Sequence, residues 1–199
     1  EHRPDAVFAP GERYAYSNTG YVVLAEVVHQ ASGMPLDVFL QDRLFDRFPF
    51  ENSGFYNRSL IYEMENYAPS WHWSVEEGRY VRPESIPGRE YLAFLSGRLG
   101  PGRLSMSLED IYLWNYILDT DAVLSPASRQ KMFSPADIGS LDMTYGFGYH
   151  NLLDSMAGRV SYHTGSWASN LSYIKKYHDA DLTVIALNNA RQSELMREI

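Results

Sequence analysis

The first part of the chain has apolar residues at helical spacing. In residues 19–33, TGYVVLAEVVHQASG, Gly33 is a natural helix end, and one face collects Tyr21, Leu24, Ala25, Val28 and Ala31. Met34-Pro35 then opens a second predicted helix, in which one stripe is formed by Leu36, Phe39, Leu40 and Leu44. Asn18 stands where the first helix begins, so this pattern alone predicts a helix cap at that residue.

The middle of the chain changes character. Residues 48–102 are rich in aromatic residues, Pro and Gly and have no clean period, so we expect a long irregular segment. In a compact domain such a segment is often functional. The stretch from Ser107 to Asp110 has the pattern of a capping box ahead of a helix through IYLWNYIL. Ser125-Pro126 predicts a short helix that ends near Phe133.

After Met143 the pattern becomes that of strands. YGFGYH, RVSYHT, SNLSYIKKY and DLTVIALNN read as short strands, with HDAD as a hairpin turn, and RQSELMREI predicts a terminal helix. A helical region followed by antiparallel strands predicts an α+β fold. We expect one partial domain over 1–199, mainly helical and irregular over 1–142, with the strands and the C-terminal helix over 143–199.

The last predicted strand raises a question of partners. LTVIAL is apolar on both faces, which is typical of an inner strand. Nothing else in the sequence is an obvious partner for its far side, and an exposed apolar edge favours aggregation. We therefore expect either that strands are missing from this chain or that a homo-oligomer completes the sheet.

Composition narrows the class of protein. The net charge of −8 disfavours nucleic acid or an anionic membrane as a partner. No apolar run approaches the roughly 18 residues of a membrane-spanning helix. The absence of cysteine excludes thiol catalysis and disulfides. The 15 tyrosines and 4 tryptophans fit a pocket for an organic ligand, and Trp71, His72 and Trp73 either line such a pocket or belong to the core.

Three segments in this order resemble the serine β-lactamase and penicillin-binding-protein-like family, in its class C-related branch of esterases and D-peptidases. They run through residues 8–48, then from GRLSM to YGFGYH over 102–150, and then through YHTGSWASNLSYI and DLTVIALNNA over 162–190. Tyr16-Ser17-Asn18 matches the family's Tyr-x-Asn motif. His163-Thr164-Gly165 matches the His-Thr-Gly variant of its strand motif.

The resemblance implies a role for each matched residue. A serine hydroxyl is a poor nucleophile until a base takes its proton, and a tyrosine oxygen serves as that base where nearby cations stabilise its anion. Tyr16 would take the proton and return it to the leaving group, while Asn18 would hold the catalytic lysine and the substrate amide. His163, Thr164 and Gly165 would align the substrate, and the Ser166 N–H would be one oxyanion-hole donor.

The family's nucleophile motif, Ser-x-x-Lys, is expected well upstream of Tyr16, where this chain has only residues 1–15. Two formal matches occur elsewhere. Ser172 and Lys175 lie in a predicted strand, where residues three apart face opposite sides. Ser128 and Lys131 share a helix face, but Arg129 and Gln130 indicate a solvated helix. We therefore expect that the chain is the C-terminal part of a longer hydrolase and that the nucleophile is absent from it.

The sequence thus predicts part of a serine hydrolase that acts through an acyl-enzyme on ester, amide or D-amino-acid peptide substrates. A small molecule or peptide is the expected partner, and no cofactor is implied. No metal is expected either, because the other histidines lack metal-ligand spacing. The alternative is a non-catalytic relative that binds a ligand in the same cleft. The resemblance alone implies a periplasmic or secreted protein.

Overall fold

The computed structural model describes residues 5–56, 65–135 and 144–191. Two compact units divide the chain, and their segments interleave along it. Unit 1 comprises Glu1–Tyr16, Ile117–His163 and Ile174–Val184. Unit 2 comprises Ser17–Tyr116, Thr164–Tyr173 and Ile185–Ile199. The predicted terminal helix, RQSELMREI, lies almost wholly outside the described residues.

The first helix of unit 2, α1 (Asn18–Ser32), confirms the sequence pattern but not the predicted cap. Ser17 is the N-cap residue, and its Oγ accepts a hydrogen bond from the Gly20 N–H at 3.0 Å. Asn18 is the first helical residue. Gly33 ends the helix in the left-handed conformation with φ of 74°, and its N–H donates to the His29 carbonyl.

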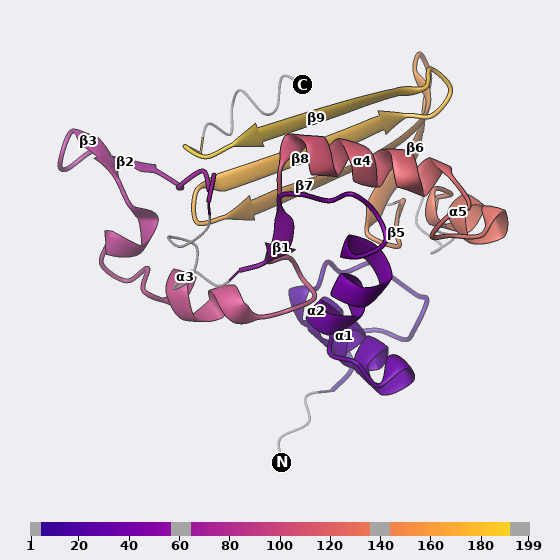
Figure 1. Ribbon diagram of the computed structural model, residues 1–199, viewed down its shortest axis with the longest axis horizontal. Helices are drawn as coiled ribbons and strands as arrows, with labels where there is room; N and C mark the ends of the chain where they lie inside the picture. The colour runs from indigo at the N-terminus through magenta and orange to yellow at the C-terminus, as the bar shows by residue number, and fades with distance from the viewer. Residues whose placement is uncertain (1–4, 57–64, 136–143, 192–199) are drawn as a thin grey trace. The chain divides into compact units, whose positions relative to one another are not determined.

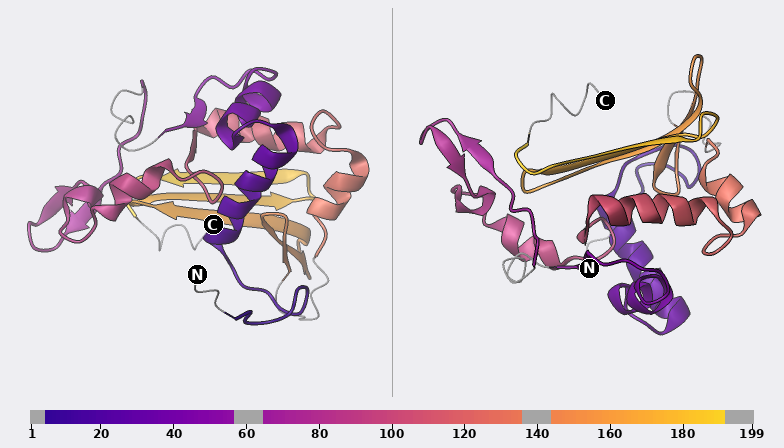
Figure 2. Two further views of the ribbon diagram at one scale, coloured as in Figure 1. Left: turned by 90° about the horizontal axis from the view of Figure 1, so that it is seen from below. Right: turned by 45° about the horizontal axis from the view of Figure 1, so that its top comes forward.

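The second predicted helix forms in two parts, with α2 (Leu36–Leu40) continuing into a π-helical turn (Gln41–Phe45). Leu44 and Phe45 are buried in this turn. Burial of Leu44 agrees with its place on the predicted apolar stripe. Figure 2 shows α2 beside α1, with which it packs. The apolar side chains of α1 are less covered than the periodicity predicts, since the exposed residues include Val22, Val23, Leu24 and Val27.

The middle segment is more regular than its sequence predicts. It contains strand β1 (Ser53–Phe55), which pairs antiparallel with β4 (Leu104–Met106), and a hairpin of β2 (His72–Ser74) and β3 (Arg79–Val81). A 3-10 turn (Pro83–Ser85), α3 (Tyr91–Phe94) and a second 3-10 turn (Leu95–Gly97) follow β3. Gly100, with φ of 109°, then approaches the α1 backbone so closely that an added Cβ would collide with the Tyr21 carbonyl.

The two later helices form as predicted. They are α4 (Leu108–Asp119) and α5 (Pro126–Met132), which is capped by Ser125. Ahead of α4, Ser107 Oγ accepts from the Asp110 N–H at 3.1 Å, which is one half of a capping box. The other half is replaced by long-range bonds, because the buried Asp110 carboxylate accepts from Asn52 N–H at 2.7 Å and Ser53 Oγ–H at 2.6 Å.

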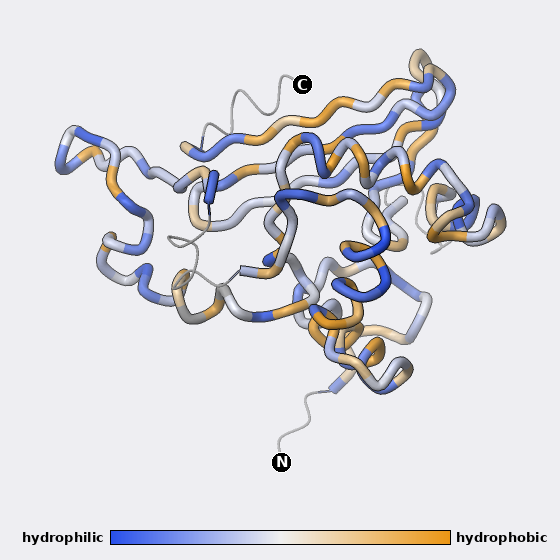
Figure 3. The backbone as a smooth tube through the Cα atoms, viewed as in Figure 1, coloured by the Kyte–Doolittle hydropathy of each residue, from blue (hydrophilic) through white to orange (hydrophobic). Residues whose placement is uncertain are grey.

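Five antiparallel strands form the main sheet, in the order β5-β6-β7-β8-β9 (Figure 1). Their bounds are β5 (Tyr145–Gly146), β6 (Tyr149–Asp154), β7 (Gly158–Trp167), β8 (Asn170–Tyr177) and β9 (Leu182–Asn188). The α+β class is thus confirmed, and so are the strands predicted from RVSYHT to DLTVIALNN. YGFGYH, predicted as one strand, is instead a hairpin of β5 and the start of β6, because the chain turns at Phe147-Gly148. β9 is the last strand in this order, as the apolar edge predicted, and its backbone is coloured as largely hydrophobic in Figure 3.

The β5–β6 hairpin has a tight turn that sets its register. Phe147 and Gly148 occupy the turn with φ of 52° and 91°, so both are left-handed, as a two-residue hairpin turn requires. Tyr145 consequently pairs with His150, and His150 pairs with Tyr162 on β7. The left-handed conformation is unusual for phenylalanine.

A buried polar network connects the strands of unit 1. The Asn151 amide donates to the Met132 and Ser134 carbonyls, at the end of α5. Asn151 Oδ1 accepts from Ser161 Oγ–H at 2.6 Å, and Ser161 Oγ lies 2.8 Å from His178 Nε2. Since the Ser161 proton is used on Asn151, His178 Nε2 carries the hydrogen that it donates to Ser161.

None of the helices that the structure describes is both long and apolar enough to cross a bilayer.

Candidate active site

Tyr16 and His163 lie together in unit 1, although they come from opposite ends of the sequence. Their rings stack with centroids 6.4 Å apart and an interplanar angle of 29°. Tyr16 is the last residue before the helix cap and is 56% exposed. His163 is half-buried on β7. The structure therefore brings together one residue from each of the two sequence motifs.

Tyr145, which the sequence analysis did not single out, lies at the centre of this group. Its hydroxyl is 3.2 Å from His163 Nε2, within hydrogen-bond distance. Its ring meets that of Tyr16 edge-on at 5.8 Å and that of Tyr14 at 5.3 Å. It also lies 4.8 Å from the ring of His150. A single half-buried tyrosine thus contacts both predicted unit 1 residues of the site.

His150 adds a second imidazole to the group. Its ring stacks on Tyr162 at 4.7 Å and lies 6.4 Å from that of His163. Burial lowers the pKa of His150 from its ordinary value, because a desolvated imidazole loses its proton more readily. We define Tyr14, Tyr16, Tyr145, His150 and His163 as the tyrosine–histidine cluster.

The other predicted site residues belong to unit 2. Asn18 is exposed at the start of α1, and because Ser17 caps the helix, the Asn18 side chain is not needed for capping. Thr164 and Ser166 are exposed on β7, with Gly165 half-buried between them. A Cβ at Gly165 would collide with Ser172 Oγ on the neighbouring strand, so β7 and β8 approach closely at this glycine.

The structure places the two formal Ser-x-x-Lys matches on α5 and β8. Ser128 lies on the exposed side of α5, and its Oγ accepts from the Ser125 hydroxyl at 3.0 Å beside the helix cap. Ser172 and Lys175 lie on β8, where successive side chains alternate between the two faces. That the nucleophile lies outside this chain stays a prediction.

The aromatic triplet Trp71, His72 and Trp73 belongs to the β2–β3 hairpin. Trp73 packs edge-on against Tyr80 at 5.2 Å, and the Arg82 guanidinium lies 5.2 Å from the Trp71 ring. Burial, with help from Arg89 and Arg191, lowers the pKa of His72. Trp71 and Trp73 are nevertheless exposed, so the alternative that they belong to the core is wrong, and a role in a pocket stays a prediction.

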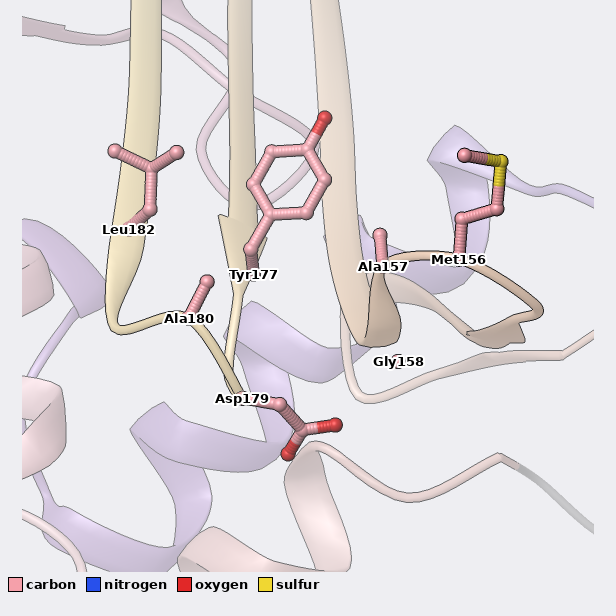
Figure 4. Close-up of a pocket in the computed structure, with 7 residues that line it drawn as sticks. All are labelled: Met156, Ala157, Gly158, Tyr177, Asp179, Ala180 and Leu182. Carbon is pink, nitrogen blue, oxygen red and sulfur yellow. The ribbon is translucent and has the colours of Figure 1, made fainter.

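Unit 1 also has a shallow hollow away from the tyrosine–histidine cluster. It lies at the ends of the β6–β7 and β8–β9 hairpins and is lined by Met156, Ala157, Gly158, Tyr177, Asp179, Ala180 and Leu182 (Figure 4). No member of the cluster lines it. Within the described ranges, no three His, Asp or Glu side chains lie close enough to hold a metal ion.

Tyr145 was missed, although the sequence contains a signal that could have placed it in the cluster. In YGFGYH the two residues Phe-Gly form a hairpin turn, so Tyr145 lies opposite His150, and His150 precedes the His-Thr-Gly strand by one hairpin. The obstacle is the turn itself, because Phe-Gly lacks the usual asparagine or aspartate signal of such a hairpin.

Comparison with known proteins identifies the family of the chain. A β-lactamase family model matches residues 3–198. Penicillin-binding protein 4* of Bacillus subtilis (strain 168) is 31% identical over 187 residues, covering 93% of this chain and 42% of that protein. The chain therefore spans less than half of the length of this relative.

Solved structures share the fold. The octameric penicillin-binding protein homologue from Pyrococcus abyssi superposes with a TM-score of 0.73 at 23% identity, over 92% of this chain and 40% of that one. The D-stereospecific amidohydrolase from Streptomyces gives 0.70 at 19% identity, over 99% and 56%. With the family match over almost all of its residues, the chain belongs to the β-lactamase family.

Proposed function

We propose that this chain carries part of the active site of a serine hydrolase that cleaves ester, amide or D-amino-acid peptide bonds through an acyl-enzyme. The observation that carries the proposal is the meeting of the exposed Tyr16 with His163 in unit 1. These residues belong to two separate motifs of one enzyme family. A structural role alone gives no reason for both motifs to contribute a side chain to one cluster.

In the proposed reaction, a serine on a Ser-x-x-Lys segment outside these residues attacks the carbonyl carbon of the substrate. The Tyr16 oxygen accepts the serine proton and passes it to the leaving group as the scissile bond breaks. Water then attacks the acyl-enzyme, and the reverse proton transfers release the acid and the free serine. Asn18 would hold the lysine and the substrate amide, and the Ser166 N–H would stabilise the oxyanion.

The imidazole at His163 bears on the substrate class. A lysine at this position would provide a permanent positive charge, whereas a histidine is largely neutral near pH 7. Binding of a substrate carboxylate is therefore weaker here, which favours esters, amides and peptides over β-lactams. The structural neighbours described as a D-stereospecific amidohydrolase and a D-amino acid amidase from Ochrobactrum anthropi are consistent with such substrates.

The test is covalent labelling of the intact protein with a fluorophosphonate, followed by location of the label by mass spectrometry. We expect label on a serine outside these 199 residues, and a rate of labelling at least about 100-fold lower in Tyr16→Phe, since a general base contributes 10²–10⁴-fold. Tyr177→Phe, a tyrosine on β8 beside the hollow, is the matched control.

Two results would contradict this proposal. Label on Ser128 would place the nucleophile on α5. A folded protein that takes no label would favour the alternative function, a non-catalytic protein that binds a ligand through the same residues.

A further inference from the structure

We propose that Tyr145 is a positioning residue that holds His163 and Tyr16 in their working arrangement. This inference rests on the proposed function, because it assigns a role to a residue beside the two reacting motifs. Tyr145 touches neither the substrate nor the nucleophile in this role. It acts through the imidazole of His163 and the ring of Tyr16.

The contact with His163 is polar and directional. The Tyr145 hydroxyl lies 3.2 Å from His163 Nε2, and the two ring centroids are 5.9 Å apart at 55°. Whichever partner donates, the bond ties Nε2 to one place and so limits rotation of the imidazole. Such a fixed second group is the usual means of setting the tautomer and orientation of a working histidine.

The contact with Tyr16 is apolar and steric. Tyr16 is 56% exposed, so few neighbours restrain its ring. Tyr145 meets that ring edge-on at 5.8 Å and 72°, a geometry in which the positive edge of one ring faces the negative face of the other. The same side chain therefore restrains the two residues that would move the proton and align the substrate.

Tyr145 is itself held in place by backbone and rings. It is the first residue of β5, its register partner is His150, and the tight Phe147-Gly148 turn fixes that register. The rings of Tyr14 and His150 pack against it at 5.3 and 4.8 Å. A side chain restrained on two sides is suited to transmit a fixed position to a third group.

The first measurement needs no activity. In the intact protein, the ring ¹⁵N shifts of His163 report its tautomer and hydrogen bonding. We expect Tyr145→Phe to change these shifts and Tyr177→Phe to leave them as in the wild type. Unchanged His163 shifts in Tyr145→Phe would overturn the proposal, whether or not the protein proves to be an enzyme.

The second measurement follows hydrolysis of p-nitrophenyl acetate. We expect Tyr145→Phe to lower kcat about tenfold, the loss of one hydrogen bond, with KM within twofold and with Tyr177→Phe unchanged. In a His163→Ala background, Tyr145→Phe should have no further effect, because the variant keeps the ring that contacts Tyr16 and removes only the hydroxyl, which acts through His163. A tenfold loss that persists in that background would overturn the positioning role. Absence of hydrolysis in the wild type would instead count against the proposed function.

Discussion

Ser17 and Asn18 are adjacent in sequence but have different roles in the structure. Ser17 Oγ accepts the hydrogen bond of the Gly20 N–H at the start of α1, a capping role that the sequence pattern predicted for Asn18. Asn18 begins the helix with an exposed side chain. An asparagine that does not cap its helix has its amide available for a ligand or a catalytic partner.

Substitution of the two residues should therefore have opposite effects. We expect Ser17→Ala to lower the free energy of unfolding by about 1 kcal/mol through loss of the cap, with little change in labelling by fluorophosphonate. Asn18→Ala should leave the free energy of unfolding within about 0.5 kcal/mol and should lower the rate of labelling. Urea denaturation and labelling of the intact protein measure both. Destabilisation by Asn18→Ala alone would return the capping role to that residue.

At the scale of elements, the polar network of unit 1 makes the stability of the sheet depend on the protonation state of His178. Burial is the largest cause that lowers the pKa of His178, and Lys176 and Arg159 act in the same direction, against Asp119 and Asp179. The folded state therefore disfavours the charged imidazole. An unfolded histidine titrates near pH 6.5 and accepts the proton freely.

Stability should consequently fall on the acid side. The contribution of His178 is fully present above about pH 6.5 and is lost as the pH falls through the lower pKa of the folded state, since the unfolded chain binds more protons there. We expect His178→Gln to flatten the decline in the free energy of unfolding between about pH 7 and 5. Urea denaturation across this range measures it, and a comparison at pH 8 separates lost packing from lost titration. An equally steep decline in the variant would assign the acid sensitivity to other groups.

The elements that could be predicted are those set by local pattern. α1 has an apolar period and a glycine stop within its own residues, α5 has a Ser-Pro start, and the strands from β7 to β9 are long enough to be recognised. β1 and β4 are three residues each and pair across the whole middle segment, Ser53 with Met106, so no local signal marks them. Asp110 was expected to serve its own helix, but it stabilises the backbone before β1 instead.

The site was predictable to the same extent. Tyr16, Asn18 and His163 were found from motif residues in a familiar order, which needs no knowledge of the fold. Tyr145 escaped because its contact with His163 depends on a left-handed Phe147 in the β5–β6 turn, a conformation that phenylalanine rarely adopts. Sequence rules that assume ordinary turn residues do not predict the register that follows from it.

At the scale of the molecule, β9 has the widest effect, since it is an edge strand of the main sheet among the described residues. β9 is last in the strand order, and Leu182 and Leu187 on it are exposed. An apolar edge strand presents unpaired backbone groups to any other strand in solution. The sequence predicted that this edge is covered either by further strands outside these residues or by a second copy of the chain.

A lysine on β9 tests whether this edge strand causes association. We expect the 199-residue chain to associate as its concentration rises, and Leu187→Lys to weaken this association several-fold, because lysine on an edge strand opposes pairing. Leu153→Lys places the same charge at an exposed leucine on β6, away from β9, and should have little effect. Light scattering with size-exclusion chromatography measures the outcome. Equal effects of the two lysines would point to general charge repulsion.

The contact between Tyr145 and His163 also supplies a sequence signature that can be searched for in other proteins. Its two residues are separated by 18 positions, which span one tight hairpin and one longer hairpin. That distance can be sought in any uncharacterised sequence as a tyrosine placed 18 residues before a His-Thr-Gly triplet. Together with Tyr-x-Asn and His-Thr-Gly, this third signature would separate β-lactamase relatives with a tyrosine at that position from those without one, before any of them is purified.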